Sequence, residues 1–503
     1  MASLTRASGD APGFGLKMLA HLYGWREARW LSRLDYRPLD QIRAVQATKL
    51  RRLLVHAANT VPYYRDLCAR RGIDPATDDS LAALRRFPVL TKSDIEANFP
   101  DRILAGGCRS FAAKHLMTSG TTSDRVEIVL SLGAQHWRHA LQLWSDSVGG
   151  RCWPGRHRLE IPPDACSRVC GERASRPEGL LAEMRWEATR RQHAGRAAVA
   201  TLARRAREAV RSRILNDTTL PPLIGPQGTS SVASTVASHV ERIAREDPWV
   251  LTALPIYLWE IARHVERTGA SLDVPVIRTM GGLCTPEMKR SIGTALNAEV
   301  FETYGSNELG AIACECGAHR GLHIAAGCYV VEILRDGRPV HPGESGSITV
   351  TCLHNDAMPL IRYEIGDIGR WVEGPCECGR ATPMLECNGR LQGLVVTPTG
   401  REVTEAEITR LAHSIPGLEH FQLIEHRPAE FDLLVVMSEG SNAPGLEQIR
   451  KVFTTVLDGA ERIEVFPVDT IYPESTGKFR FVKSATYDDF ARDAEKSAPD
   501  AAK

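Results

Sequence analysis

The chain has 503 residues, of which 43% are hydrophobic and 24% are charged. This length allows at least two domains with sizeable cores, and this composition is typical of a globular protein. The formal net charge of +1 gives the whole protein no electrostatic attraction for nucleic acids or acidic membranes, so we expect neither as a partner.

Two further features bear on location. No apolar run approaches the length that spans a bilayer, and Met1 to Gly15 lacks the apolar segment of a secretory signal. The thirteen cysteines are therefore expected to be reduced or metal-bound rather than paired in disulfides. We expect a cytoplasmic protein, and the sequence leaves a homodimer open.

The N-terminal region, residues 1–110, has helical spacing of its apolar residues. A helix is expected from Asp40 to Ala58, and Pro62 should end it, because proline cannot continue a helix. A short extended piece at 87–90 precedes another helix, for which Thr91 or Ser93 is the expected cap.

A run of Ser, Thr and Gly residues at 118–123 leads into an apolar, β-prone segment. Such a loop carries many backbone N–H groups and hydroxyls that can converge on polyphosphate oxygens. It is not a Walker loop, because no Gly-Lys-Ser/Thr sequence closes it. An ordinary Ser/Thr turn is the alternative interpretation.

A basic segment follows at 185–213, after an expected helix at 135–148. Apolar residues of the basic segment fall on one helical face, and most of its arginines lie off that face. A phosphate or nucleic-acid patch is one interpretation. We favour the solvated face of an amphipathic helix, because few aromatic residues are interleaved for base stacking.

Strand and helix patterns alternate in the middle of the chain. The expected strands are 248–255, 274–280 and 299–305, with a helix at 256–266 and another that opens at Pro286. This alternation predicts a layered α/β sheet, whose ligand crevice lies at the carboxyl ends of the strands. The Gly281-Gly282 pair and the segment 304–308 should therefore lie close together.

The remaining segments complete the expected architecture. Strands at 329–334 and 346–352 indicate an antiparallel β region. A compact α+β unit begins at Leu391, with helices at 405–413 and 445–457. The predicted fold is thus a large α/β domain, residues 1–390, and a small mobile α+β domain, residues 391–503.

Two cysteine-bearing turns form a separate signal, at 314–323 and 376–380. They fit a closed tetrahedral zinc site, which has no open coordination position and would therefore be structural. The expected ligands are Cys316, His323, Cys376 and Cys378, with Cys314 and His319 as spare candidates. A set of reduced cysteines without metal is the alternative.

Five motifs stand in a fixed order along the chain. They are Thr118–Ser123, Gly281-Gly282, Tyr304–Glu308, Arg362–Asp367 and Ser475–Arg480. In this order they resemble the adenylate-forming superfamily of acyl-CoA synthetases and adenylation domains, and the phenylacetate–CoA ligase-like branch in particular. The segments 61–65, 88–92 and 358–363 also resemble signatures of that branch, so the resemblance spans about residues 45 to 485. Each motif alone is weak, but the ordered set is specific.

The resemblance implies an AMP-forming ligase that joins a small carboxylic acid to ATP as an acyl-adenylate. We expect coenzyme A as the acceptor of the acyl group, with an amine as the alternative. A rival is an adenylyltransferase that leaves AMP on its target, and another is a zinc-stabilised binding protein without activity. The acid itself cannot be read from the sequence, although 254–259 and 281–284 are expected to line its pocket.

The resemblance also implies a role for individual residues. Glu308 would hold Mg²⁺ beside ATP, and Lys478 would bridge the carboxylate and the α-phosphate. Asp367 would bind the ribose hydroxyls and Arg390 would be a second nucleotide contact. The residues expected around the phosphates and the adenine are Ser119, Gly120, Thr121, Thr122, Gly281, Gly282, Tyr304 and Gly305.

The chain departs from the family pattern in three segments. Asn307 stands where a Thr usually precedes the glutamate. Ser123, Asp124 and Arg125 stand where the phosphate loop usually continues with Gly, Lys and Pro. Gln392 stands near the interdomain hinge, where an acidic residue is usual, although Gly393 can still flex. These departures bear on the efficiency of adenylation and on the swing to a second half-reaction.

Overall fold

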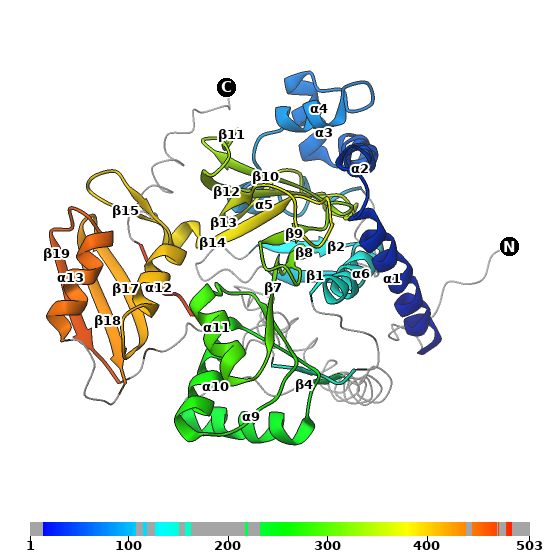
Figure 1. Ribbon diagram of the computed structural model, residues 1–503. Coiled ribbons are helices and arrows are strands. Elements are labelled where there is room, and N and C mark those ends of the chain that lie inside the picture. The colour runs from blue at the N-terminus through cyan, green and yellow to red at the C-terminus, as the bar shows by residue number, and fades with distance from the viewer. Residues whose placement is uncertain are drawn as a thin grey trace, which may run out of the picture.

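Figure 1 shows the computed structural model of the protein. It describes residues 14–106, 114–117, 126–149, 156–161, 217–219, 232–438, 445–469, 471 and 479–484. The expected phosphate loop at 118–123, the basic segment at 185–213 and Lys478 lie outside these residues.

A single mixed sheet of 12 strands organises most of the chain, in the order β11-β10-β12-β13-β14-β9-β8-β7-β6-β5-β3-β4. Five of its strands form a parallel half, in which β4 pairs with β3, β3 with β5, β5 with β6 and β6 with β7. These strands are β3 (Arg158–Glu160), β4 (Asp217–Thr219), β5 (Val250–Ala253), β6 (Val276–Met280) and β7 (Glu299–Ser306). The strands expected at 248–255, 274–280 and 299–305 are therefore confirmed.

The other half of the sheet is antiparallel and begins with β8, which pairs with β7 in the antiparallel direction. Its strands are β8 (Gly310–Glu315), β9 (Leu322–Ile324), β10 (Tyr329–Arg335), β11 (Arg338–Pro339), β12 (Ser345–Cys352), β13 (Tyr363–Val372) and β14 (Met384–Arg390). The expected antiparallel region is thus present. It is continuous with the parallel half rather than a separate sheet.

Three helices pack on the parallel half, at the bottom of Figure 1: α9 (Val232–Glu246), α10 (Pro255–Thr268) and α11 (Pro286–Ala295). Their apolar faces share one core with β3, β5 and β6. Pro286 begins α11 as expected, and the Thr285 hydroxyl accepts a hydrogen bond from the backbone N–H of Met288. The helix therefore starts directly after the loop that follows β6.

The N-terminal helices surround the antiparallel half. They are α1 (Phe14–Leu34), α2 (Leu39–Thr60), α3 (Pro62–Arg71), α4 (Ser80–Arg86), α5 (Lys92–Asn98) and α6 (Leu132–Val148), with a hairpin of β1 (Lys114–Met117) and β2 (Glu127–Leu130) before α6. Pro62 not only ends α2 but begins α3, because its fixed φ suits a first helical turn. Thr91 rather than Ser93 caps α5, in a reciprocal capping box with Asp94.

The C-terminal segment forms a second sheet with its own core, at the left of Figure 1. The strand order is β19-β18-β17-β20, from β17 (Leu418–Arg427), β18 (Glu430–Met437), β19 (Arg462–Pro467) and β20 (Val482–Lys483). Helices α12 (Glu405–His413) and α13 (Leu446–Val456) pack on it, and the short η2 (Leu391–Gly393), β15 (Val395–Val396) and β16 (Glu402–Val403) precede α12. The α/β fold class with a small α+β unit is confirmed, while the domain boundary at 390 remains a prediction.

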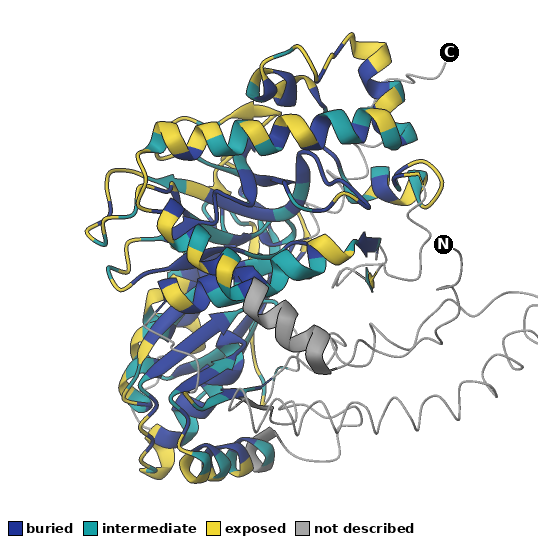
Figure 2. Ribbon diagram, turned by 90° about the vertical axis from the view of Figure 1, so that its right-hand side faces the viewer, coloured by how far each residue is buried: buried dark blue, intermediate teal, exposed yellow. Residues whose placement is uncertain are grey.

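Burial follows these layers. Figure 2 shows buried residues concentrated in the strands and exposed residues along the outer sides of the helices. In the segments that the structure describes, no helix has both the length and the apolar character needed to cross a bilayer.

A buried ion pair ties α6 to the parallel half of the sheet. Arg278 of β6 donates from Nη1 to Asp146 Oδ1 at 2.8 Å, and the two side chains are only 3% and 4% exposed. Arg278 also donates to Ser145 Oγ and to the carbonyl of Gly149. This network holds the C-terminal end of α6 against the sheet. The face of α6 that lies next to the strand ends therefore also has a fixed position.

We predict that Arg278→Met destabilises the protein by about 3 kcal/mol, because it leaves the buried Asp146 with one cationic partner fewer. Chemical denaturation would measure the loss. Arg450→Met is the matched control, because Arg450 forms an exposed pair with Glu447 one helical turn away. Equal stability of the two variants would contradict a stabilising role for the buried pair.

Candidate active site

A cavity of about 360 Å³ opens at the carboxyl ends of the parallel strands, next to the C-terminal unit. Loops that follow β5, β6 and β7 form its floor, as expected for a sheet of this kind. The strands β13 and β14 and the segment 479–482 close it from the other side. Residues of the large sheet and residues of the C-terminal unit therefore line the same cavity.

Two glycines after β6 let the main chain lie directly on the neighbouring loop. Gly281 has a φ of +77°, and a Cβ there would lie 3.1 Å from Leu254 Cδ2. A Cβ at Gly282 would lie 3.3 Å from Pro255 Cδ. Larger residues would have to displace the β5 loop, so glycine keeps this wall of the cavity flat and its backbone accessible.

Asp367 is the centre of a buried polar group. The Tyr304 hydroxyl donates to Asp367 Oδ2 at 3.0 Å, and Arg390 Nε lies 3.3 Å from Asp367 Oδ1. Burial, followed by the charge of Asp367, raises the pKa of Tyr304, and Asp367 raises the pKa of Arg390. Both partners thus stay protonated and orient the Asp367 side chain at the cavity.

Glu308 lies on the turn between β7 and β8, and it is only 7% exposed. The Tyr363 hydroxyl donates to Glu308 Oε1 at 3.1 Å. Burial, followed by the charge of Glu308, raises the pKa of Tyr363, so the hydroxyl remains a donor. The carboxylate is therefore aimed into the cavity by one hydrogen bond and retains acceptor sites for a ligand.

The C-terminal side of the cavity is tied to the end of β14 by Glu405. This buried carboxylate accepts hydrogen bonds from the backbone N–H of Phe481 at 3.2 Å and of Arg390 at 3.4 Å. Burial raises its pKa. Arg480 also donates to Gln392 Oε1 at 3.1 Å, so the segment after Lys478 is held against η2.

The structure brings together the expected site residues that it describes. Those around the cavity are Gly281, Gly282, Tyr304, Gly305, Glu308, Asp367 and Arg390. Ser119, Gly120, Thr121, Thr122 and Lys478 lie outside the described residues. The strands that flank the first four, β1 and β2, pair with each other, and Phe479, which follows Lys478, lines the cavity.

Several polar residues of the cavity were not predicted. Arg138, Gln142, Glu160, Glu302 and Glu405 line it from α6, β3, β7 and α12. Glu302 carried the clearest sequence signal, because it stands two residues before Tyr304 in an apolar strand. The others lie in segments without a recognisable motif, and only the packing of the chain places them here.

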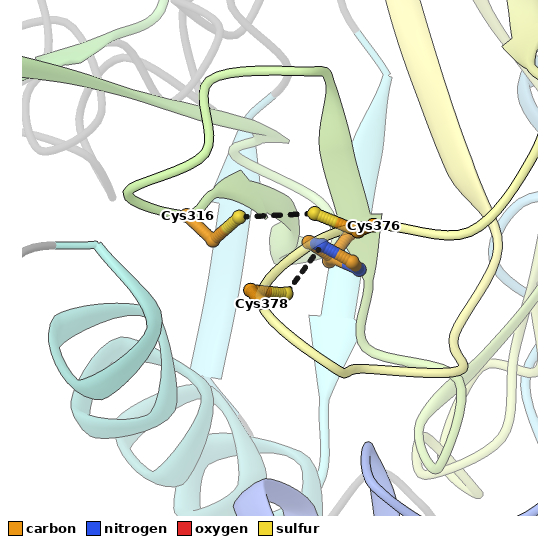
Figure 3. Close-up of side chains that lie close together, drawn as sticks. Cys316, Cys376 and Cys378 are labelled. Carbon is orange, nitrogen blue, oxygen red and sulfur yellow. Dashed lines mark hydrogen bonds between the residues drawn. The ribbon is translucent and has the colours of Figure 1, made fainter.

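The four expected metal ligands also come together. In Figure 3, Cys316, Cys376 and Cys378 point toward one another, and with His323 their ligand atoms all lie within 4.8 Å of one another. Cys316 Sγ is 3.5 Å from Cys376 Sγ, and Cys378 Sγ is 3.3 Å from His323 Nε2. A tetrahedral zinc site places two sulfurs about 3.8 Å apart, so this donor set fits the ion.

The surroundings of the cluster suit a closed metal site. The Thr382 hydroxyl lies 3.1 Å from His323 Nδ1, which orients the ring with Nε2 toward the sulfurs. Burial lowers the pKa of His323 to about 4, so the ring is neutral, as a metal ligand must be. The cluster joins the end of β8 to the loop between β13 and β14.

The two spare candidates have other environments. Cys314 is buried in the main core. His319 lies 3.2 Å from Glu315 and 3.3 Å from Glu299, and its ring packs against Phe301. Neither belongs to the group whose ligand atoms converge.

Comparisons with known proteins agree with the motifs. No family model matches the chain. It is similar to phenylacetate-coenzyme A ligases from Thermus thermophilus, 22% identical over 79% of this chain and 81% of that protein, and from Escherichia coli, 24% identical over 81% and 85%. A solved structure of 2-hydroxyisobutyryl-CoA ligase with an acyl-AMP in the postadenylation state superposes with a TM-score of 0.67 at 18% identity. That superposition covers 93% of this chain and 94% of the other. The resemblance to adenylate-forming enzymes of the phenylacetate–CoA ligase-like branch is therefore confirmed.

We predict that Gly305→Ala disturbs the β7–β8 turn, because an added Cβ would lie 2.1 Å from the carbonyl oxygen of Gly310. The backbone must shift, at a cost of about 1–3 kcal/mol. Thermal unfolding measures the loss, and hydrogen exchange should rise across 299–315. Gly445→Ala is the control, because a Cβ there meets no atom within 4 Å. Unchanged exchange in the hairpin of the Gly305 variant would contradict the prediction.

Proposed function

We propose that this protein is an AMP-forming ligase that activates a carboxylic acid with ATP and transfers the acyl group to coenzyme A. The observation that carries the proposal is that the motif residues from separate segments, 281–282, 304–308, 367 and 390, line a single cavity. The similarity to phenylacetate-coenzyme A ligases over four-fifths of the chain supports the same reaction class.

The nucleoside would lie on the wall made by Gly281, Gly282 and Tyr304. Backbone exposed by two glycines allows close approach of the flat adenine. Asp367 would accept hydrogen bonds from the ribose hydroxyls, because an ionised carboxylate has about four acceptor positions and the structure uses two of them. Arg390 would add a cation beside the sugar and the α-phosphate.

The triphosphate would lie between Glu308 and the loop that carries Ser119, Gly120, Thr121 and Thr122. Glu308 offers a hard carboxylate ligand for Mg²⁺, and its orientation by Tyr363 fits this use. When bound, the ion would neutralise charge on the phosphates. Lys478 would enter from the C-terminal unit, since the next residue, Phe479, already lines the cavity.

The two half-reactions follow from this arrangement. A carboxylate oxygen of the acid attacks the α-phosphorus of ATP, the bond to pyrophosphate breaks, and an acyl-adenylate forms. The thiol of coenzyme A, after losing its proton, then attacks the acyl carbon and AMP leaves with the bonding electrons. Lys478 would stabilise the negative charge on the α-phosphate of the transferred adenylyl group in the first step.

The second step would need the C-terminal unit to move, with 391–503 as the mobile domain. In this structure the unit contacts the larger part through both ring packing and polar groups, and Ile256 of α10 packs against the core of the unit. His413 stacks on Trp259 at 5.0 Å, and its Nδ1 lies 3.2 Å from the hydroxyl of Thr285. Arg263 and Glu419 form a further ion pair across the same contact. Gln392 and Gly393 lie where such a motion would pivot.

We further propose that Cys316, His323, Cys376 and Cys378 hold a structural Zn²⁺. Four protein ligands leave no open coordination position, so the ion would cross-link loops rather than take part in the reaction.

Lys478→Ala should lower acid-dependent ATP–pyrophosphate exchange by about 100-fold or more, because it removes the cation that faces the reacting phosphate. Exchange would be measured across a panel of carboxylic acids, with thermal unfolding to check that the fold is intact. Lys451→Ala, an exposed lysine on α13, is the matched control. Full exchange by the Lys478 variant would remove that residue from the site.

Purified protein should contain about one zinc per chain, and Cys376→Ser should lower both the zinc content and the unfolding midpoint, since metal binding contributes to folding. Elemental analysis and thermal unfolding provide the two readouts. His319→Gln is the control and should keep its zinc, because this side chain lies outside the converging group. Loss of zinc from the His319 variant alone would show that the ligand set is wrong.

A further inference from the structure

Part of the cavity wall is polar, and helix α6 contributes to it beside the turn between β7 and β8. Arg138 and Gln142 line the cavity, together with Glu160 at the end of β3. Residues four apart share one face of a helix. The opposite side of α6 carries Leu141 and Trp144, which are fully buried in the main core. The helix therefore presents a charged face to the cavity and an apolar face to the protein.

Arg138 is held in place from one side. Its Nη1 donates to the carbonyl of Asn307 at 2.8 Å. Its aliphatic stem and guanidinium carbon lie on Gly310, where an added Cβ would meet Cγ at 3.4 Å and Cζ at 3.6 Å. Gly310 has a φ of +83°, so glycine serves both the turn and the close approach of the arginine. A cation is thus anchored at a fixed position on the cavity wall.

The other edge of the guanidinium is available to a ligand. Within the described residues, the carbonyl of Asn307 is the only hydrogen-bond partner of Arg138. This leaves the edge formed by Nε and Nη2, whose parallel N–H groups match the two oxygens of a carboxylate. Neither atom is a buried group without a partner, so the edge has access to the cavity or to water.

Neighbouring acids do not neutralise this cation. Asp146, one turn beyond Gln142, is already paired with Arg278 and Arg158. Glu160, which also lines the cavity, has interactions of its own. A purely apolar tail, such as an unsubstituted phenyl ring, would take the guanidinium out of water without offering it an acceptor, which is unfavourable.

We propose that the acid activated by this protein carries a second anionic group, a carboxylate, at the end remote from the reacting carboxylate, and that Arg138 binds it. This inference rests on the proposed function and specifies its substrate class as dicarboxylic acids. The residues that bind the nucleotide would determine which carboxylate reacts, because they fix the position of the α-phosphate. Arg138 would favour acids whose other end carries a negative charge.

The test compares acids that have the same shape but a different charge. Straight-chain and aryl diacids of graded length are each paired with the acid in which the remote carboxylate is replaced by a primary amide. ATP–pyrophosphate exchange gives kcat/KM for each member. We expect the best diacid to exceed its amide by about 10- to 100-fold, as for loss of a charge-assisted hydrogen-bonded pair.

Variants show whether Arg138 is the cause of this preference. Arg138→Gln should reduce the ratio of diacid to amide toward one, and Arg138→Lys should restore part of it, because a point charge remains but the paired geometry is lost. Arg450→Gln, an exposed arginine on α13, should keep the wild-type ratio. A variant ratio equal to that of the wild type would overturn the role of Arg138.

Other outcomes separate this inference from the proposed function. Exchange that favours neutral or amine-bearing acids would overturn the inference and leave the ligase function in place; an amine preference would point to Glu160 as the selecting group. If no acid supports exchange and calorimetry detects no binding of ATP or AMP, both the proposed function and the inference fail.

Discussion

The close contact between β7 and β8 is the constraint on which the site depends. Gly305 passes so near the carbonyl of Gly310 that no side chain fits between them. This contact makes the turn tight enough to hold Glu308 at the cavity, and the register of β7 and β8 shifts between Tyr304 and Gly305, next to it. The same pair of strands thus carries the cavity wall at one end, and Cys316, the first residue of the Cys/His cluster, lies just beyond the other.

An ionic network joins β7 to β8 at the end of the strand pair away from the turn. Glu315, next to Cys316, accepts hydrogen bonds from Lys289 Nζ at 2.9 and 2.8 Å and from the backbone N–H of Glu302 at 3.0 Å. Lys289 is also 3.4 Å from Glu302 Oε2. Burial raises the pKa of Glu302 to about 7, although Lys289 opposes the shift. These contacts tie β7, which forms part of the cavity wall, to the residue that precedes Cys316.

Local sequence patterns were sufficient for many elements and for part of the site. Alternating apolar runs identified β5, β6 and β7, because buried parallel strands are short, apolar and ended by turn residues. Pro286 and Thr91 marked helix starts, because capping depends on neighbouring residues alone. The convergence of Cys316, His323, Cys376 and Cys378 was also foreseen, since short turns that bear ligands on adjacent strands have few ways to meet.

What the sequence by itself determined is therefore the order and type of many of the elements, the strand ends that bear the glycines and carboxylates, and the four Cys and His residues that converge. Only the tertiary structure decided which other side chains line the cavity. Arg138, Glu302 and Glu405 reach it because α6, β7 and α12 pack at particular angles, and no local pattern records such an angle. Tyr363 orients Glu308 from 55 residues away for the same reason: the partner of a buried carboxylate is chosen by packing, which the spacing of residues along the chain does not express.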